Sequence, residues 1–448
     1  MNEKLLCNFS HFGKKINIVL IFPESYKFGI ANLGHQTVFR ILNESQSVNC
    51  ERYYIDSSDS KFFSFETGRF LTDFDFIGFT SSYELDFFKI TDLLKKLKLY
   101  PLDRRENIRK RPVIISGGAM TFINPYVLQE FSDIVVMGDF ESIAEKFISI
   151  LDSVKSGTPI KTIMEEYDFI FTPHLKVNAP NISEKIKAYS SIISESSQFP
   201  STYLIELCRG CPYKCSFCST GSTRGKLRFI NRELFDSIVN MLISNNIKKV
   251  GLIGSAVLLY PDIEEMLKNF IDKGIMFSFS SLNISDINEK MLEFISKTNQ
   301  QTLTLAPEVG SEKMQKIIGK KIDFDKLYTI VRYAASYGIT RIKLYFLYGF
   351  EQEEKSDLEG IIKLVTAIKN YTCISGRPFN LIVSLNPVIP KPHTQMSAIK
   401  MQPKKVLSDK LSFLKNGLKS TGTRIESMSI NEAVIQYSIA NFQPNNPH

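Results

Sequence analysis

Four cysteines lie within eleven residues in the middle of the chain, in the stretch CRGCPYKCSFC from Cys208 to Cys218. Three of them, Cys211, Cys215 and Cys218, have the spacing C-x3-C-x2-C, and the aromatic residue Phe217 precedes the last one. Thiolates are the usual protein ligands of iron–sulfur clusters, so three thiolates on one loop can hold three corners of a four-iron four-sulfur cluster. The fourth iron would then lack a protein thiolate and stay open to a small chelating ligand.

The first cysteine, Cys208, opens two other interpretations. Four thiolates could close a structural zinc site, whose tetrahedral shell can be made entirely of cysteines. They could instead hold a ferredoxin-type cluster that only carries electrons. Zinc knuckles usually place their cysteine pairs further apart than this stretch does. A non-catalytic electron carrier or structural zinc protein is therefore the alternative from a different class, and a Cys208 variant separates the two classes because only a four-ligand site would lose its metal.

The cysteine stretch needs elements that hold it in place, and the sequence around it alternates between strand and helix patterns. A strand-like run, Thr202 to Leu207, leads into the loop. Further strands are expected over 249–253, 276–280, 301–305, 341–347 and 381–385, with helical stretches between them. Repeated βα units indicate parallel strands, and such folds place their sites at the carboxyl ends of the strands.

The N-terminal part of the chain has a similar alternation. Apolar runs over 16–22, 76–80, 113–116 and 134–137 predict buried parallel strands. Helical patterns lie between these runs, which predicts a doubly wound, Rossmann-like α/β sheet. Gly117 and Gly118 follow the third run, where glycine lets a ligand approach the backbone closely.

The cysteine loop, with Phe217 before its last cysteine, resembles the signature of radical S-adenosylmethionine (radical SAM) enzymes. In that family the open iron binds the amino and carboxylate groups of SAM. One electron from the reduced cluster then gives a 5′-deoxyadenosyl radical, which abstracts hydrogen from a substrate. The resemblance implies Cys211, Cys215 and Cys218 as metal ligands, Phe217 as a neighbour of the cofactor, Cys208 as a spectator, and a partial (β/α)6 barrel as the core.

The same resemblance implies SAM contacts at the ends of the barrel strands. Gly254 and Ser255 stand where the family contacts the amino group, although its usual form has two glycines and an acid. Ser280 follows the next strand and could bond the ribose or the carboxylate. The APE-x-GS stretch makes Glu308 the acid expected to contact SAM; the alternative for this residue is a helix N-terminal acid stabilised by the helix dipole. Gly349, in KLYFLYGF, permits a close turn beside the adenine.

The N-terminal part resembles the cobalamin-binding-type domain that precedes many radical SAM cores. The matching segments are FPESYKFGIANLG, FDFIGFTSSYELDF and ISGGAMTFINP. They imply cofactor contacts at Ser81, Gly117 and Gly118. Cobalamin domains that supply a histidine to cobalt carry D-x-H-x-x-G, whereas LGHQTV around His35 lacks both the Asp and the second Gly. His35 is therefore expected to be a helix-start or surface histidine, and the resemblance supports the domain shape more firmly than the cofactor.

Length and composition limit how many domains the chain can form. The chain of 448 residues carries a net charge of +8 and has room for two or three domains. The expected divisions are a cobalamin-binding-like domain over 1–150, a linker over 151–198, the radical SAM core over 199–400 and a C-terminal helical extension with a polar tail over 401–448. No apolar run reaches the length of a membrane span, and the first residues lack a signal-peptide pattern. A cytoplasmic protein is expected.

The resemblance implies an enzyme that cleaves SAM reductively with a 4Fe-4S cluster. With cobalamin as a further cofactor, the expected reaction is methyl transfer to an unactivated carbon, with methylcobalamin as the methyl source. The alternative within the family is a radical SAM enzyme without cobalamin that performs another rearrangement or oxidation. An electron donor such as flavodoxin or ferredoxin is implied. A small molecule, lipid or peptide is favoured over RNA as the substrate, because the C-terminal tail shows no RNA-binding β-domain.

Overall fold

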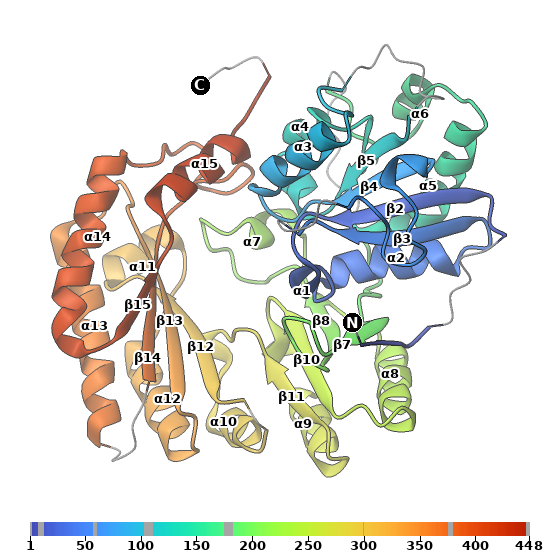
Figure 1. Cartoon of the computed structure of the whole chain (residues 1–448). Helices are drawn as coiled ribbons and strands as arrows, with labels where there is room; N and C mark the ends of the chain where they lie inside the picture. The colour runs from blue at the N-terminus through green and yellow to red at the C-terminus, as the bar shows by residue number, and fades with distance from the viewer. Residues whose placement is uncertain are drawn as a thin grey trace. The chain divides into compact units, whose positions relative to one another are not determined.

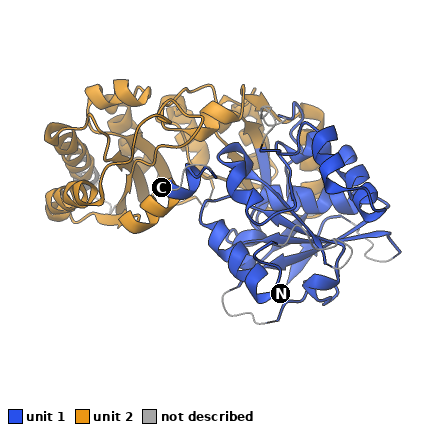
Figure 2. Ribbon diagram, turned by 90° about the horizontal axis from the view of Figure 1, so that it is seen from above, with its two compact units in different colours: residues 1–206, 438–448 blue, residues 207–437 orange. Residues whose placement is uncertain are grey.

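The computed structural model describes residues 2–7, 13–56, 61–102, 111–173, 182–298, 300–374 and 380–444. The chain forms two compact units: unit 1, residues 1–206 together with 438–448, and unit 2, residues 207–437 (Figure 2). Part of the expected linker, 174–181, and the end of the expected tail, 445–448, lie outside the described residues. The domain boundaries at 150, 198 and 400 stay predictions. None of the helices in the described ranges has both the length and the apolar character that a membrane crossing requires.

Unit 1 is built on a parallel sheet of five strands in the order β3-β2-β4-β5-β6. The strands are β2 (Ile16–Phe22), β3 (Val48–Tyr54), β4 (Phe76–Thr80), β5 (Val113–Gly117) and β6 (Ile134–Val135). The helices are α1 (Tyr26–Gly29), α2 (Leu33–Glu44), α3 (Asp86–Lys96), α4 (Pro125–Gln129), α5 (Phe140–Lys155) and α6 (Ile160–Glu166). The predicted doubly wound α/β fold is confirmed. Its strand order reverses between β2 and β4, and ligands of such sheets bind at this switch point.

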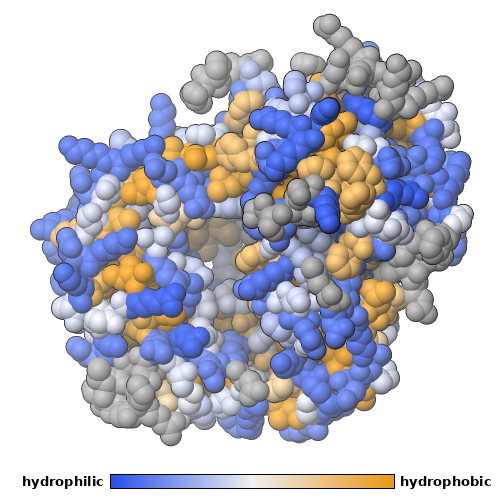
Figure 3. Space-filling view, in the orientation of Figure 1, coloured by the Kyte–Doolittle hydropathy of each residue, from blue (hydrophilic) through white to orange (hydrophobic). Residues whose placement is uncertain are grey.

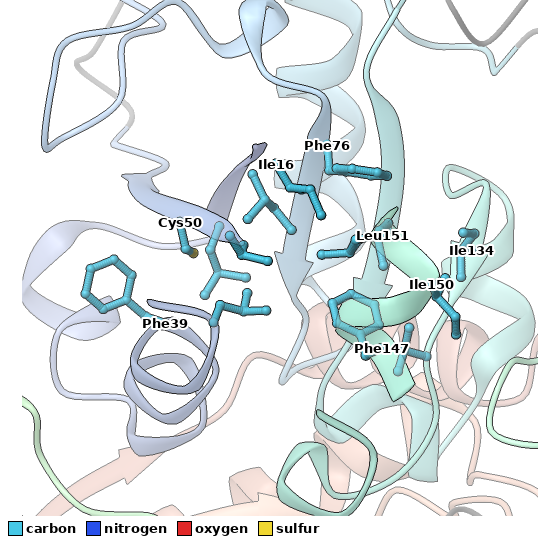
Figure 4. Packing of buried hydrophobic residues seen from close by; sticks show 14 of the residues in the cluster. Ile16, Phe39, Cys50, Phe76, Ile134, Phe147, Ile150 and Leu151 are labelled. Atoms are coloured by element: carbon cyan, nitrogen blue, oxygen red, sulfur yellow. The ribbon is translucent and has the colours of Figure 1, made fainter. Parts of the chain in front are cut away.

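Hydrophobic side chains pack on both faces of this sheet. One cluster joins the strands to α2 and α5, and Figure 4 shows part of it around Phe39 and Phe147. A second cluster joins the opposite face to α3, through residues such as Ile90. Ile18 and Val19 are neighbours in β2 but belong to different clusters, because successive strand side chains point to opposite faces. Burial on both faces explains why the predicted strands appear in the sequence as continuous apolar runs.

The sequence pattern does not predict β3, because VNCERYY mixes charged and apolar residues. All seven residues of the strand are nevertheless buried. Glu51 accepts a hydrogen bond from the Ser64 hydroxyl at 2.6 Å, and Arg52 pairs with Glu3 at 2.8 Å and with Glu66 at 2.6 Å. Buried charges persist when they are paired and hydrogen-bonded, so partners from distant parts of the chain make this segment an interior strand.

The last residues of the chain also belong to unit 1. Besides the antiparallel pair β1 (Glu3–Leu5) and β7 (Ile192–Ser194), unit 1 includes the end of α15 (Ile430–Ala440). Ala440 is fully buried in the second hydrophobic cluster. The side-chain amide of Asn124 donates to the carbonyl oxygens of Ile439 and Phe442, at 3.1 and 2.8 Å. The chain therefore returns to unit 1 after it has passed through unit 2.

Unit 2 contains two sheets, ordered β11-β10-β8-β9 and β12-β13-β14-β15. A parallel bridge between Leu282 and Leu305 joins them, so the strands follow one another around a partial barrel (Figure 1). The strands are β8 (Tyr203–Arg209), β9 (Arg228–Phe229), β10 (Lys249–Gly254), β11 (Met276–Phe279), β12 (Thr302–Glu308), β13 (Arg341–Tyr348), β14 (Asn380–Pro387) and β15 (Arg424–Ser427). The helices are α7 (Ser219–Thr223), α8 (Arg232–Ser244), α9 (Ile263–Asp272), α10 (Glu289–Ser296), α11 (Glu312–Ile318), α12 (Phe324–Ser336), α13 (Lys355–Ile374) and α14 (Lys404–Leu418).

The predicted partial (β/α)6 barrel is confirmed in β8, β10, β11, β12, β13 and β14, and two short strands extend it. The strand β9 pairs antiparallel with the end of β8, and β15 pairs in parallel with β14. The sequence predicts only helices in the C-terminal extension. Helix α14 agrees with that expectation, but β15 does not, because its four residues, RIES, carry no apolar run that periodicity could detect.

Candidate functional site

The cysteine loop begins where β8 leaves the sheet. Gly210 has a φ of +78°, and a Cβ atom there would lie 2.3 Å from the Lys226 carbonyl oxygen, so this exit requires glycine. The loop then carries Cys211, Cys215 and Cys218, and the Cys218 N–H donates to the Cys215 carbonyl at 3.1 Å. All three cysteines are partly exposed. The structure thus brings the three predicted metal ligands together at the carboxyl end of the first barrel strand, just before α7 (Figure 1).

Three neighbouring βα connections hold this loop through hydrogen bonds. The pairs are Ser255 to the Gly210 carbonyl after β10, the Tyr213 hydroxyl to Asp286 after β11, and Ser216 to the Ile318 carbonyl after β12. The Ser216 N–H lies 2.9 Å from its partner oxygen, and its hydroxyl donates to a second carbonyl, that of Ile317, at 3.1 Å. The loop is therefore tied across the carboxyl ends of three strands, which preorganises the thiols for metal binding.

Cys208 lies apart from the other three cysteines. It is part of β8 and only 1% exposed. Its sulfur accepts a hydrogen bond from the Ala256 N–H at 3.4 Å, and a Cβ atom on Gly254 would lie 2.5 Å from that sulfur. The Cys208 sulfur is thus enclosed by the connection after β10, while the other thiols lie on the loop. This arrangement favours three metal ligands over four.

Phe217 packs on a hydrophobic cluster beside the loop. The buried members of that cluster are Val309, Met314, Ile318, Phe350, Val388 and Met396. The contact ties the cysteine loop to α11 and gives the aromatic residue a structural role. The predicted contact between Phe217 and a cofactor stays a prediction.

The other predicted SAM contacts lie around the same mouth of the barrel. Gly254 and Ser255 follow β10 and contact the end of β8, as described above. Ser280 directly follows β11 and is exposed. Gly349 directly follows β13 with a φ of +91°, and a Cβ atom there would lie 2.4 Å from a methyl carbon of Leu407. Both glycines are thus explained by close packing, and the contact of these four residues with SAM stays a prediction.

Glu308 is the last residue of β12 and is 9% exposed. The Lys320 ammonium lies 2.9 Å from its carboxylate and 2.7 Å from the Ala306 carbonyl oxygen. Helix α11 has Ser311 as its N-cap, so Glu308 lies outside the first helical turn and is not the helix N-terminal acid of the alternative interpretation. Its φ of +64° is unusual for a residue with a side chain, so the surrounding structure must hold it in this position.

Lys320 acts on both Glu308 and the thiols. Burial raises the pKa of the Glu308 carboxyl, and the ion pair with Lys320 opposes that rise. Burial also raises the pKa of Cys215 to about 11; Lys320 again opposes the rise, and the charges of Cys218, Glu308 and Cys211 add to it. Because metal ligation needs thiolates, a cation beside the loop favours ligation. The sequence analysis missed Lys320, whose only local signal is the turn at Gly319, where φ is +64°.

In unit 1, the residues expected to contact cobalamin gather at the switch point. The Ser81 N–H donates to the Gly117 carbonyl at 2.9 Å. Gly118 has a φ of +106°, and a Cβ atom there would lie 2.4 Å from the Ser81 carbonyl oxygen. The connections after β4 and β5 therefore meet without a side chain between them. Ser81 is only 1% exposed, and its contact with a cofactor stays a prediction, as do those of Gly117 and Gly118.

His35 is a helix-start residue, as expected, but it is fully buried and not a surface residue. Its ring lies between Phe22 and Tyr54, with centroid distances of 5.4 and 5.6 Å. Nδ1 lies 3.1 Å from the Thr80 hydroxyl, and Nε2 has no hydrogen-bond partner within the described residues. Burial lowers the pKa of His35 to about 3, so the imidazole is neutral at physiological pH.

Comparison with known families identifies the chain. The family described as "Radical SAM proteins, N-terminal" matches residues 34–171, and the family described as "Radical SAM superfamily" matches residues 205–365. The chain therefore belongs to the radical SAM superfamily. It is a radical SAM enzyme, of a class that uses a 4Fe-4S cluster and SAM and needs an electron donor.

Two relatives illustrate the range of similarity in sequence. An uncharacterised protein of Methanocaldococcus jannaschii is 27% identical over 437 residues, which cover 95% of this chain and 88% of that protein. The ribosomal protein uS12 methylthiotransferase of Thermodesulfovibrio yellowstonii is 21% identical over 265 residues, 55% of this chain and 62% of the relative.

Two solved structures share the fold. The radical SAM methyltransferase TsrM from Kitasatospora setae has a TM-score of 0.60 at 12% identity and covers 86% of this chain and 77% of its own. The cobalamin-dependent radical SAM enzyme OxsB has a TM-score of 0.52 at 15% identity and covers 90% of this chain and 56% of its own. At these identities the likeness shows the fold, with an N-terminal α/β part before the barrel.

Proposed function

We propose that this radical SAM enzyme transfers a methyl group to an unactivated carbon with the help of cobalamin. The main support for the proposal is that the four cysteines occupy two different environments. Three thiols share a loop held over the carboxyl ends of the barrel strands, and the fourth, Cys208, is enclosed elsewhere. Three ligands leave one iron of a four-iron cluster open to a chelating ligand, which suits the amino and carboxylate groups of SAM.

The residues of the barrel mouth would bind and orient SAM. When bound, the cluster and SAM supply a carbon radical that removes hydrogen from the substrate. Cys211, Cys215 and Cys218 would hold the cluster. Glu308 and Lys320 form a buried pair of opposite charge next to the loop, so they match a ligand that carries both an ammonium and a carboxylate. In the proposal Glu308 orients the amino group and Lys320 the carboxylate of SAM.

Two features of unit 1 support the cobalamin part of the proposal. One is the switch point of its sheet, and the other is a buried histidine nitrogen without a hydrogen-bond partner among the described residues. The switch point is formed by small residues, Ser81, Gly117 and Gly118, whose backbones meet directly. The Nδ1 atom of His35 lies 3.1 Å from the Thr80 hydroxyl at the end of β4, and its buried Nε2 atom has no partner among the described residues. One of the solved TsrM structures contains cobalamin and a 4Fe-4S cluster. When bound here, cobalamin would supply the methyl group, and the small residues would let its large ring approach the sheet.

The partners follow from the same proposal. Reductive cleavage of SAM consumes an electron, and we propose a flavodoxin or ferredoxin as its source. We propose a small molecule, lipid or peptide as the methyl acceptor. A second candidate function, another radical rearrangement or oxidation without cobalamin, keeps the same barrel chemistry and leaves unit 1 as a substrate-binding or relic domain.

Cofactor retention tests the proposal. The protein is purified without oxygen, its cluster is reconstituted, and it is incubated with hydroxocobalamin and desalted. The absorption spectrum, an iron assay and the amount of 5′-deoxyadenosine formed from SAM are then recorded. The proposal expects one cobalamin and about four irons per chain, together with SAM cleavage. Iron and SAM cleavage without cobalamin would leave the second candidate function, and iron without SAM cleavage would contradict both.

A further inference from the structure

The second sheet of unit 2 has two different faces. On β13, Ile342, Leu344, Phe346 and Tyr348 are buried, and the residues between them are partly exposed. Helices α12, α13 and α14 lie along the outer side of this sheet (Figure 1). Because successive strand side chains alternate between faces, the buried residues pack under the helices and the partly exposed ones face the inside of the barrel.

The inner face of this sheet carries polar groups side by side. In the parallel register, Tyr345 of β13 lies opposite Ser384 of β14, and Ser384 lies opposite Glu426 of β15. Lys343 lies on the same face, one row nearer the start of β13. Barrel interiors of this kind are usually filled by branched apolar side chains. A continuous polar row therefore makes packing in the interior less favourable than apolar side chains would, which indicates that it binds a polar ligand.

The charges on this face do not cancel. The Lys343 ammonium lies 2.8 Å from one oxygen of Glu426, and the Arg424 guanidinium lies 3.1 Å from the other. Two cations thus share one carboxylate, which leaves one surplus positive charge. An ammonium has three N–H donors. The Lys343 ammonium pairs with Glu426 and also lies 5.1 Å from the centroid of the Tyr345 ring.

These charged groups remain accessible to solvent. The side chains of Lys343 and Glu426 are 25% and 33% exposed, and that of Arg424, on the end strand β15, is 74% exposed. Figure 3 shows the molecule hollowed between the two sheets of unit 2. A surplus charge at the wall of a hollow with low-dielectric sides attracts a ligand of opposite sign.

We propose that Lys343 and Arg424, the two cations that share Glu426, bind the anionic group, a carboxylate or a phosphate, of a small acid that is the substrate. This inference rests on the proposed function and deepens it by naming the substrate class. Lys343 is five residues before Tyr348, the last residue of β13, or roughly 16 Å at the usual rise of a parallel strand. A substrate held by its acid group here would extend along the barrel toward the cysteine loop and present its far end to the radical chemistry.

Binding and stability distinguish this role from that of a structural ion pair. If Lys343 and Glu426 only support the sheet, removal of either partner weakens the protein and any ligand binding in the same direction. If they bind an anion, the two substitutions have opposite effects. Loss of Lys343 removes the attraction, and loss of the Glu426 charge removes a repulsion while Lys343 and Arg424 stay.

The experiment measures binding of three six-carbon probes, hexanoate, hexyl phosphate and hexanol, to the cluster-reconstituted protein by calorimetry. We expect at least one anion to bind and hexanol not to bind. Lys343→Met should weaken anion binding at least tenfold, Lys343→Arg should stay within about threefold of the wild type, and Glu426→Gln should strengthen binding about threefold. The matched control is Lys268→Met, which removes an exposed lysine of an i,i+4 pair on α9 and should change nothing.

The results test the proposal and show which anionic group the site prefers. Tighter binding of hexanoate than of hexyl phosphate assigns a carboxylic acid, and the reverse assigns a phosphate ester. Absence of anion binding up to 10 mM, equal binding of hexanol, or weaker binding in both Lys343→Met and Glu426→Gln overturns the proposal. The assay does not depend on SAM cleavage or on cobalamin, so failure of the proposed function in those assays is distinguishable from failure of this site.

Discussion

The predicted sites of the two units lie at equivalent places in their sheets but carry different groups. In both units the predicted site lies at the carboxyl ends of parallel strands. The barrel mouth of unit 2 carries three thiols and the buried pair of Glu308 and Lys320. The switch point of unit 1 carries small residues and one neutral histidine, His35. Topology therefore supplies the location in both units, and only in unit 2 do side chains already define the chemistry.

The comparison predicts different sensitivity to substitution. A site made by a few side chains fails when one of them is removed, because each ligand supplies a bond that nothing else replaces. A site made by close backbone approach fails when a side chain is added, because the added atoms occupy the space. The following predictions test this contrast in order of decreasing effect.

The largest effect is expected for Cys215→Ala. Loss of one of three ligands should remove the cluster, so the iron content should fall from about four per chain to near zero and 5′-deoxyadenosine formation should fall to background. Cys208→Ala is the matched control, because Cys208 is enclosed beside Ala256 and should keep its iron. Equal loss of iron in both variants would restore the four-ligand interpretation.

The next effect is expected for Lys320→Met. The substitution leaves the Glu308 carboxylate buried without its cation, which costs about 3 kcal/mol of the free energy of unfolding. SAM cleavage should fall about a hundredfold. The iron content should fall much less, because the three cysteines are intact and only the cation that favours their thiolates is lost. Urea unfolding and chromatography of 5′-deoxyadenosine measure the two effects.

A double variant provides the control for this pair. Glu308→Gln combined with Lys320→Met removes both charges and should recover part of the lost stability without recovering SAM cleavage. If Lys320→Met lost iron and SAM cleavage in the same proportion, Lys320 would be a support of the cluster and not of SAM.

In unit 1, Gly118→Ala should act by adding atoms. Gly118 has a φ of +106°, and its new Cβ atom would lie 2.4 Å from the Ser81 carbonyl oxygen. Overpacking and backbone strain together should cost about 3 kcal/mol of the free energy of unfolding, and cobalamin retention should fall with it. Gly68→Ala is the control, because Gly68 also has a positive φ but no atom within 4 Å of the new Cβ; it should cost roughly 1 kcal/mol.

The smallest effect is expected for His35→Phe and depends on pH. The folded-state pKa of His35 is about 3, and the unfolded value is about 6.5. Between these values the unfolded state binds more protons, so the free energy of unfolding falls as the pH falls through this window. Between pH 6.5 and 4.5 the wild type should lose on the order of 2 to 3 kcal/mol more than the variant.

Urea unfolding at the two pH values measures this difference. Phe39→Leu is the control, because it changes packing on the same sheet without removing a titratable group and should leave the pH dependence unchanged. An identical pH dependence in wild type and His35→Phe would show that His35 does not stay neutral in the folded unit.

The sequence was sufficient for the features that depend on local spacing. The cysteine loop is contiguous, so its three predicted ligands could be selected from residue types, intervals and the resemblance to the radical SAM signature. The apolar runs of β2, β4 and β5 could be identified because burial on both faces leaves a continuous signal. The predicted doubly wound sheet followed from the alternation of such runs with helices. In unit 2 the alternation predicted only repeated βα units, and the partial six-stranded barrel was implied by the resemblance to radical SAM enzymes.

Features that depend on distant partners could not be predicted in this way. The strand β3 is interior only because Glu51 and Arg52 find partners outside the strand, on the segment that follows it and, at Glu3, near the start of the chain. Lys320 reaches the cysteine loop only because α11 ends beside it, where Ser216 bonds the Ile318 carbonyl. The strand β15 is defined by its pairing with β14 and not by its own residues. In each case the deciding contact is made with residues outside the element itself.

The return of the chain to unit 1 has a consequence for the order of synthesis. Domains generally fold from the N-terminus as they emerge from the ribosome. The sheet of unit 1 emerges first, but Ala440 and the carbonyl partners of Asn124 emerge only after all of unit 2. At usual elongation rates this interval is roughly 10 to 50 seconds. During this time the surface that will receive Ala440 is uncovered, so the first unit to begin folding is among the last parts of the molecule to be completed.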